Sequence, residues 1–445
     1  TTGTNHTLLG ALAGDALTTG EGNVAIGKSA LSTETTGGKN VAIGARSQED
    51  VNNSGNGNNV SVGFESMLNA TTAVGTTAIG SSAVGGGVMT GDFNTAVGYL
   101  SGLDMTSGVE NTLIGGNAGE NLTIGNYNTV LGYKALQKSV DGDFNTAVGY
   151  RALEDYEDGD GNGFNTAIGA SSQLQASTGQ FNTSLGALSI SVGVMTGDHN
   201  TALGYKAGED LVGGHSNVLV GSFTGQSMDS GLGNVAVGYN ALFTNIDGDG
   251  NVAIGTDALK TLEPADGLSY NIAVGYHAGK LMTTGVGNTI LGGLAGDALT
   301  TGAHNVAIGY EALGAEDVGG KNVAIGRRAL KVLDGVADGF NTVIGYEAGD
   351  AVSSGDENTI IGANAGGLIT SGQKNTIIGE GADVASGGGG VDNAIAIGHD
   401  AEALGANTTV IGTGSTTNAI VHGLRKSVNT TATNVAAARV NNIYN

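Results

Sequence analysis

Two acidic segments have the residue spacing of a metal-binding loop. Each places three oxygen-bearing side chains at alternate positions, namely Asp158, Asp160 and Asn162 in "DGDGNG" and Asn245, Asp247 and Asp249 in "NIDGDG". Carboxylate and amide oxygens so spaced are typical Ca²⁺ ligands, but both segments lack the glutamate that ends an EF-hand loop. We therefore treat them as candidate calcium loops in the turns of another fold. The alternative is that they are solvated acidic turns, since Asp, Asn and Gly all favour turns.

No other group of residues suggests catalysis or a cofactor. The chain has no cysteine, and its seven histidines are dispersed without the His-x-x-His spacing of a zinc site. The sequence contains no Gly-x-Ser-x-Gly elbow, and its glycines are not framed by the strand–helix unit of a dinucleotide-binding motif. We expect that the protein is not an enzyme and that calcium is its only candidate cofactor.

Composition points to a repetitive β structure. Glycine accounts for 82 of 445 residues, there is a single proline, and aliphatic residues are plentiful. The net charge of −24 argues against nucleic-acid and anionic-membrane partners, which require basic surfaces. No apolar run reaches the roughly 20 residues that a membrane-spanning helix needs, so no membrane insertion is expected.

The elements that must position any site belong to one short repeat. A hexapeptide such as "NTAVGY" recurs in 24 units between residues 6 and 412, and 15 of the 23 spacings are 17 residues. Position 1 is Asn in 20 units, position 2 is Thr, Val or Ile, position 4 is Ile, Val or Leu, and position 5 is always Gly. We predict an all-β fold, a parallel β-roll or β-solenoid of about 24 coils of about 17 residues. Residues 413–445 lack the repeat and form a separate cap, neck or junction.

The period-2 pattern also predicts which side chains face inward. Positions 2 and 4 share one face of a strand, and their branched side chains favour the interior of the coil. Positions 1, 3 and 5 would then face outward, toward a neighbouring chain, with alanines such as Ala96, Ala147, Ala236 and Ala307 in that contact. Asn at position 1 should form a ladder along the stack or bond to turn backbone, and Gly at position 5 suits a corner.

Tyrosine recurs at position 6. Eight of the 12 tyrosines occupy it: Tyr99, Tyr133, Tyr150, Tyr205, Tyr239, Tyr276, Tyr310 and Tyr346. Two interpretations stay open. The column is either a corner stack that shields the coil edges or a stripe of aromatic faces on which sugar rings stack.

The hexapeptide resembles the "NSVAIG" repeat of trimeric autotransporter adhesin heads of the YadA-like family, and also the "NTAVGY"-type repeats of bacteriophage tail fibres. The similarity covers about residues 5–412, although the family repeat is nearer 14 residues than 17. The resemblance implies a left-handed parallel β-roll that assembles as a homotrimer.

The resemblance also implies a structural and adhesive role. We expect an extracellular fibre, either a virion tail fibre or a cell-surface adhesin shaft, that attaches to a glycan or protein receptor on a host surface. Two other classes stay open from the repeat alone: a self-assembling filament subunit, and an ice- or glycan-binding β-solenoid. If position 2 faces inward, its threonines cannot form the outward array that an ice-binding face needs.

Overall fold

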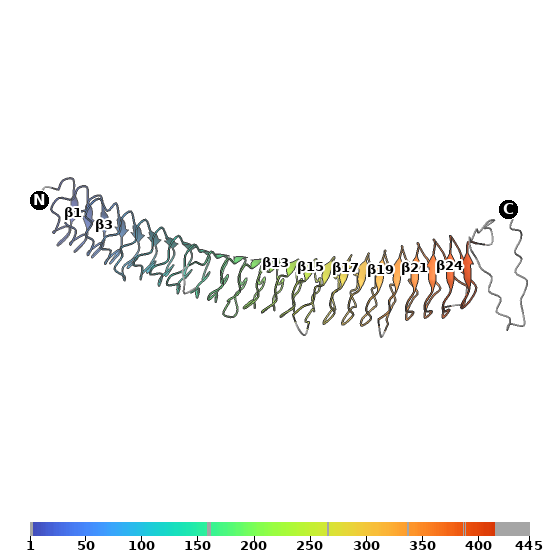
Figure 1. The fold of residues 1–445 in the computed structure, drawn as a ribbon. Coiled ribbons are helices and arrows are strands. Elements are labelled where there is room, and N and C mark those ends of the chain that lie inside the picture. Colours follow the sequence, from blue (N-terminus) through green and yellow to red (C-terminus); the bar gives the residue numbers. More distant parts are fainter. Residues whose placement is uncertain are drawn as a thin grey trace, which may run out of the picture.

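The computed structural model describes residues 3–157, 162–264, 267–335, 338–385, 387 and 389–413. Within these residues the chain is a long, gently curved rod built from one 24-stranded parallel sheet and a small sheet of two strands. Strands occupy one side of each coil and loops the other (Figure 1). The prediction of a rod-shaped, all-β parallel solenoid is confirmed. The predicted terminal segment 413–445 lies almost entirely outside the described residues.

Each strand of the large sheet is three residues long and consists of positions 2 to 4 of one repeat. The strands are β1 (Thr7–Leu9), β2 (Val24–Ile26), β3 (Val41–Ile43), β4 (Val60–Val62), β5 (Thr77–Ile79), β6 (Thr95–Val97), β7 (Thr112–Ile114), β8 (Thr129–Leu131), β9 (Thr146–Val148), β10 (Thr166–Ile168), β11 (Thr183–Leu185), β12 (Thr201–Leu203), β13 (Val218–Val220), β14 (Val235–Val237), β15 (Val252–Ile254), β16 (Ile272–Val274), β17 (Thr289–Leu291), β18 (Val306–Ile308), β19 (Val323–Ile325), β20 (Thr342–Ile344), β21 (Thr359–Ile361), β22 (Thr376–Ile378), β24 (Ile395–Ile397) and β26 (Thr409–Ile411). The small sheet pairs β23 (Asp383–Val384) with β25 (Glu402–Ala403).

Every strand of the large sheet pairs in register with the strand of the next coil. Thr146 of β9 pairs with Thr166 of β10 although they are 20 residues apart, just as Thr166 pairs with Thr183 at the usual spacing of 17. Extra residues are therefore accommodated in the loops and do not shift the strands. Only glycine fits at position 5, because a Cβ built on Gly149 or Gly169 would lie 2.5 Å from the carbonyl oxygen of the position-5 glycine in the next coil.

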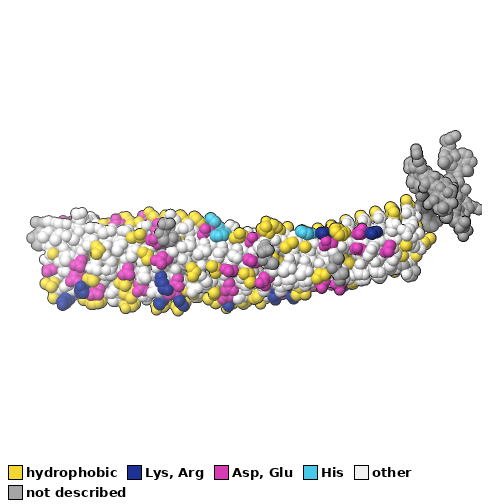
Figure 2. Space-filling view, turned by 60° about the horizontal axis from the view of Figure 1, so that its bottom comes forward, with side chains coloured by type: hydrophobic (Ala, Val, Ile, Leu, Met, Phe, Trp, Pro, Cys, Tyr) yellow, Lys and Arg dark blue, Asp and Glu magenta, His cyan; other side chains and the backbone are white. Residues whose placement is uncertain are grey.

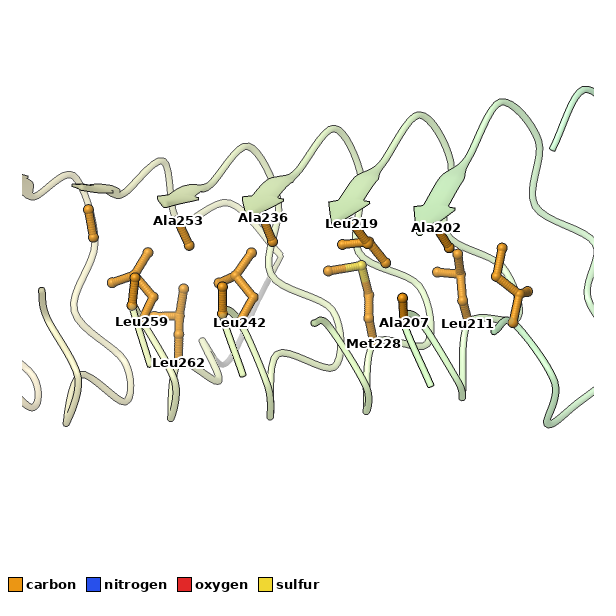
Figure 3. Close-up of a cluster of buried hydrophobic side chains, with 14 of the residues drawn as sticks. Ala202, Ala207, Leu211, Leu219, Met228, Ala236, Leu242, Ala253, Leu259 and Leu262 are labelled. Carbon is orange, nitrogen blue, oxygen red and sulfur yellow. The ribbon is translucent and has the colours of Figure 1, made fainter. Parts of the chain in front are cut away.

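The prediction about which positions face inward is wrong. Position 3 is buried, with Ala96, Ala147, Ala236 and Ala307 all 0% exposed inside their own chain, whereas positions 2 and 4 face outward. Figure 3 shows Ala202, Leu219, Ala236 and Ala253 pointing from their strands into the coil. The reason is volume: a 17-residue coil is too narrow for two branched side chains per strand beside the leucines and methionines of the opposite loop. These alanines therefore cannot form a contact between chains.

Inside the coils, large and small side chains at two positions of the repeat compensate for one another in volume. We call the third residue after the hexapeptide position 9. Position 3 holds a large residue, such as Leu113 or Ile290, where position 9 is glycine both in the same coil and in the preceding coil. A Cβ built on Gly119 would lie 3.0 Å from a Leu113 methyl carbon, and one on Gly279 would lie 3.0 Å from an Ile290 methyl carbon. Where position 9 is leucine, position 3 is usually alanine. The core is thus close-packed in every coil, with little space for added atoms.

Replacing Ala147 with leucine should therefore destabilise a single chain. Position 9 is leucine both in the coil of Ala147 (Leu153) and in the preceding coil (Leu136), and all three side chains are fully buried. We expect a loss of about 1–3 kcal/mol of unfolding free energy, because added methyl groups in a filled core force strain. Chemical denaturation followed by circular dichroism measures it. A variant as stable as the wild type would contradict the assignment of position 3 to the core.

Asparagines at position 1 form the predicted ladder. Oδ1 of Asn94 accepts the backbone N–H of Asn111 at 2.9 Å, and Nδ2 of Asn111 donates to the carbonyl of Gly125 at 2.8 Å. This pattern repeats along the rod and satisfies buried backbone groups between coils. The exceptions lie in three of the longer coils, where Nδ2 of Asn40, Asn145 and Asn322 is buried without a partner.

Candidate functional site

An uncharged strip of threonine and aliphatic side chains runs along the sheet. We call it the strand face, defined as positions 2 and 4 of the 24 strands of the large sheet. All of these residues are Thr, Val, Ile or Leu. Several position-4 side chains are half exposed, among them Leu131 (48%), Leu185 (50%) and Ile411 (50%). Apolar patches that extend this far are typical of interaction surfaces.

A column of aromatic side chains precedes position 1 of the repeat. We call the residue immediately before position 1 position 0. Where it is not glycine, its φ is near +50 to +60°. Five successive coils carry stacked rings there: Tyr127, Phe144, Phe164, Phe181 and His199. Neighbouring ring centroids are 4.8, 4.8, 5.2 and 4.9 Å apart, and the planes differ by at most 12°. Phe144, Phe164 and Phe181 each have a stacked neighbour on both faces, so the stack stabilises the rod.

The sequence interpretation missed this column. Bulky residues rarely adopt positive φ, so a phenylalanine just before the strand was not expected to form a regular array. A signal was nevertheless present, because the triplet Asp-Phe-Asn occurs at both 92–94 and 143–145. Repetition of a strained position with the same residue type indicates a structural role for its side chain.

The tyrosines of position 6 behave differently, because most do not stack continuously. Tyr133 and Tyr150 stack with centroids 5.9 Å apart, and Tyr276 stacks on its neighbour His277 with centroids 3.7 Å apart, whereas Tyr99 is 60% exposed. The corner-stack interpretation therefore fits part of the column. Several other tyrosine rings are covered by neighbouring side chains, as Lys206 covers Tyr205 and Arg327 covers Tyr346.

The structure describes only part of the two candidate calcium loops. Asp158 and Asp160 lie outside the described residues, and Asn162 forms a β-bridge with Asp143. In the second loop Asn245 is fully buried and donates through Nδ2 to the carbonyl of Gly248 at 3.0 Å. Asp249 instead accepts the backbone N–H of Leu232 at 2.7 Å.

Asp249 belongs to a structural series. Asp92 and Asp198 occupy the same place two residues before the position-1 asparagine, and each accepts a backbone N–H from the preceding coil at 2.8 and 2.7 Å. An aspartate in "DGN" or "DFN" therefore has a role without any metal. Calcium binding by either loop stays a prediction.

The calcium prediction is tested by melting. If Asp158, Asp160 and Asn162 bind Ca²⁺ only in the folded chain, millimolar calcium should raise the melting temperature relative to chelator by mass action. Asp160→Ala should remove that rise. For the second loop, Asp249→Asn keeps an acceptor for Leu232 while removing a charge, which makes it a cleaner variant than alanine. Equal melting curves in calcium and chelator would leave both loops as acidic turns.

A different acidic group is brought together by the fold. Among the described residues, Glu316, Asp317 and Asp334 are the one set of three acidic or histidine side chains whose ligand atoms lie within 4.8 Å of one another. Glu316 is fully buried and accepts the backbone N–H groups of Gly319 at 2.6 Å and of Gly335 at 3.4 Å. Its carboxyl therefore anchors the longer loop of the next coil.

Burial is the main cause that raises the pKa of Glu316, and the charges of Asp317 and Asp334 add to it. A carboxyl whose folded pKa is raised stabilises the fold below its unfolded pKa, and that contribution is lost as the pH rises through the folded value. We expect the melting temperature of Glu316→Gln to depend less on pH above 4.5 than that of the wild type. Scanning calorimetry from pH 4 to 7 measures it, with the exposed Glu357→Gln as control. If the melting temperatures of the wild type and Glu316→Gln change equally with pH, the pKa of Glu316 is not raised in the folded chain.

The remaining surface is acidic and carries no catalytic constellation among the described residues. Figure 2 shows acidic side chains spread along the flank of the rod and hydrophobic side chains along its margins. A cavity of about 200 Å³ next to Glu316 is lined by Leu333, Asp338, Ser354, Asp356, Gln373 and three glycines, and no histidine lies in that lining to act as a base toward Ser354. Within the part of the chain that the structure describes, no helix could cross a membrane.

Comparisons with known proteins do not assign the chain to a family. No protein-family model matches the chain, and no curated protein matches it significantly. The strand face and the aromatic columns are therefore the observations on which a function can be argued.

Proposed function

We propose that this chain is the rod-shaped shaft of a homotrimeric extracellular fibre, either a virion tail fibre or a cell-surface adhesin. Its role would be attachment to a host surface through a glycan or protein receptor. The observation that carries the proposal is the strand face, which a single chain leaves exposed from β1 to β26. The β-solenoid fold is compatible with a fibrous structural protein.

The size of the strand face supports burial against other chains. With coils about 4.8 Å apart, the face extends for roughly 115 Å. A column of threonine, valine and isoleucine at position 2 and an aliphatic column at position 4 cover an area on the order of 1,000 Å² over that length. No charged residue occurs at positions 2 or 4, although the chain has a net charge of −24. Depletion of charge at the centre of a surface is typical of interfaces.

Cyclic symmetry would place identical coils at the same height. Three copies around one axis would bring the aliphatic columns together and keep the acidic loops outside, since the loops lie on the other side of each coil (Figure 1). The number three comes from the resemblance of the hexapeptide to trimeric adhesin heads. Two copies could also cover the face, so the number of chains must be measured.

Light scattering coupled to size-exclusion chromatography tests the assembly. We expect a mass three times the 43.7 kDa of one chain, independent of concentration. A monomer at micromolar concentration would contradict the proposal. A mass that grows with concentration would instead indicate the filament alternative, in which coils stack end to end.

A second candidate is favoured by one observation. Because position 2 faces outward, the eight successive strands from β5 to β12 present threonines Thr77, Thr95, Thr112, Thr129, Thr146, Thr166, Thr183 and Thr201 in one regular column. This column removes the argument against an ice-binding face that the sequence suggested. An ice-binding solenoid would be a monomer with measurable thermal hysteresis, whereas the buried face of a fibre would give none.

A further inference from the structure

A cavity formed by the loops of three successive coils, those of β13, β14 and β15, is lined by aromatic rings. It has a volume of about 280 Å³, and its lining consists of Phe223, Tyr239, Phe243, Gln226, Asn240 and Lys260. None of these residues belongs to a strand, so the cavity lies outside the strand face. Pockets for drug-sized ligands begin at roughly 300 Å³, so this cavity suits a ligand of one small ring.

The two phenylalanines of the lining depart from the pattern of the repeat. Five of the eight phenylalanines in the chain occupy position 0, the position of the ring column. Phe223 at position 7 and Phe243 at position 10 are the only phenylalanines that the 24 units place at those positions. A purely structural role would be expected to recur from coil to coil. Two exceptional rings that meet in one cavity instead indicate a local role, such as contact with a ligand.

Contacts between rings hold part of the lining in place. The centroid of Phe223 lies 5.4 Å from that of Tyr205 and 5.8 Å from that of Tyr239, with planes at 89° and 86°. Perpendicular rings at these distances attract one another. Tyr239 is nevertheless 51% exposed, so part of its ring surface faces solvent.

Two amide groups of the lining are oriented by carboxylates. Nε2 of Gln226 donates to Oε2 of Glu209 at 2.6 Å, and Nδ2 of Asn240 donates to Oδ1 of Asp257 at 3.0 Å. An ionised carboxylate only accepts hydrogen bonds, so each amide turns its nitrogen toward it. The amide oxygens are then the ends that can accept a ligand hydroxyl group, and the ammonium group of Lys260 supplies a donor.

We propose that this cavity binds one neutral pyranose ring of a surface glycan. A pyranose carries on the same small ring C–H groups, which pack on aromatic rings, and hydroxyl groups, which need hydrogen-bond partners. The three rings and three polar groups of the lining match both requirements. A purely apolar ligand would leave the polar groups without partners, which costs free energy. The inference rests on the proposed attachment function and names the chemistry of the receptor.

Charges next to the cavity favour a neutral sugar. Nζ of Lys260, the one cation of the lining, lies 3.5 Å from Oδ1 of Asp257, and Nζ of Lys206 lies 3.0 Å from Oε1 of Glu209. Each positive charge is therefore compensated by a carboxylate and gives little attraction for an acidic sugar. The net charge of −24 on the chain would repel one.

Saturation-transfer-difference NMR on the assembled wild-type protein, with irradiation of the aromatic protons, tests the cavity. The probes are the methyl glycosides of glucose, galactose, mannose and N-acetylglucosamine, each at millimolar concentration and measured alone. We expect transfer to the ring protons of at least one probe, because three aromatic rings lie in the lining.

The repeat itself supplies variants that suit the fold. Phe243→Ser introduces the residue type that position 10 has at Ser191, and it should abolish the transfer. Phe223→Asn copies Asn117, whose φ of 56° matches the 59° of Phe223, and it should do the same. Phe64→Ser is the matched control, because Phe64 is 52% exposed on a distant coil and lies outside the lining. The control should keep the wild-type transfer.

Several outcomes would overturn the inference. Transfer that survives Phe243→Ser and Phe223→Asn, or that is lost equally in Phe64→Ser, places the sugar elsewhere, and absence of transfer from all four probes removes the cavity as a sugar site. Light scattering on the same samples separates this inference from the proposed function. A trimer without transfer overturns only the cavity, whereas a monomer whose transfer is abolished by Phe243→Ser supports the cavity and contradicts the fibre.

Discussion

Replacing Gly238 with alanine should lower the stability of the rod by at least about 3 kcal/mol. Gly238 is the position-5 glycine that follows β14, and its φ of +133° is rarely available to residues with a side chain. An alanine Cβ would lie 2.6 Å from the carbonyl oxygen of Gly255 in the next coil. That contact is with backbone, so relieving it requires the two coils to separate.

The substitution should weaken one interface between coils as well as lower the overall stability of the rod. In a stacked-coil protein each coil contacts mainly its neighbours, so stability is a sum of coil and interface contributions. Weakening one interface should open the rod near residue 238, which limited proteolysis would detect as a new cleavage site. Thermal melting by circular dichroism should show a lower or a split transition.

Gly233 provides a matched control five residues away. It has a φ of +66°, but a Cβ built there would meet no atom within 4 Å. Other coils place phenylalanine or histidine at this position 0, so Gly233→Ala should change stability by no more than about 1 kcal/mol. Equal effects of the two substitutions would contradict the stacking role of position 5.

The repeat made the fold predictable, and the same repeat explains the error about orientation. Gly at position 5 recurs in every unit and fixes the register of parallel strands despite loops of different length. Hydrophobicity alone then assigned Val24 and Ile26 to the interior, although Ala25 between them is the buried residue. Branched residues suit either side of a strand, since β propensity reflects packing on whichever surface is covered.

A better signal for the interior was present in the sequence. Position 3 becomes large, as in Leu113 or Leu219, where position 9 of the same and the preceding coil is glycine. Such compensation of volume occurs only between side chains that share a packed space. It identifies position 3 as the core position without reference to hydrophobicity.

The candidate sites were less predictable because the chain turns sharply within them. Alternate residues of an extended segment share one side, but Asn245 and Asp249 lie on either side of a corner, so one is buried and the other bonds to Leu232. The contacts among the tyrosine rings depend on pairs of coils and on the residue after position 6. Only the stacked structure brings Tyr205, Phe223 and Tyr239 together.

Placing aspartate on the strand face should prevent assembly without unfolding the chain. Leu131 of β8 and Leu185 of β11 are 48% and 50% exposed in a single chain, so a carboxylate at either position stays solvated in the monomer. In a trimer the double variant Leu131→Asp/Leu185→Asp would bring three like charges together at each of two levels. Burying an unpaired charge costs about 3–5 kcal/mol, which is enough to shift the equilibrium to monomers.

Light scattering and circular dichroism, measured on the same sample, separate the two effects. We expect the double variant to have the mass of one chain and to retain a β spectrum. Val194→Asp is the matched control, because Val194 is 60% exposed in the loop between β11 and β12 and lies outside the strand face. The control should keep the wild-type mass. If the double variant also keeps it, the strand face does not join the chains, and the exposed threonine column becomes the stronger guide to function.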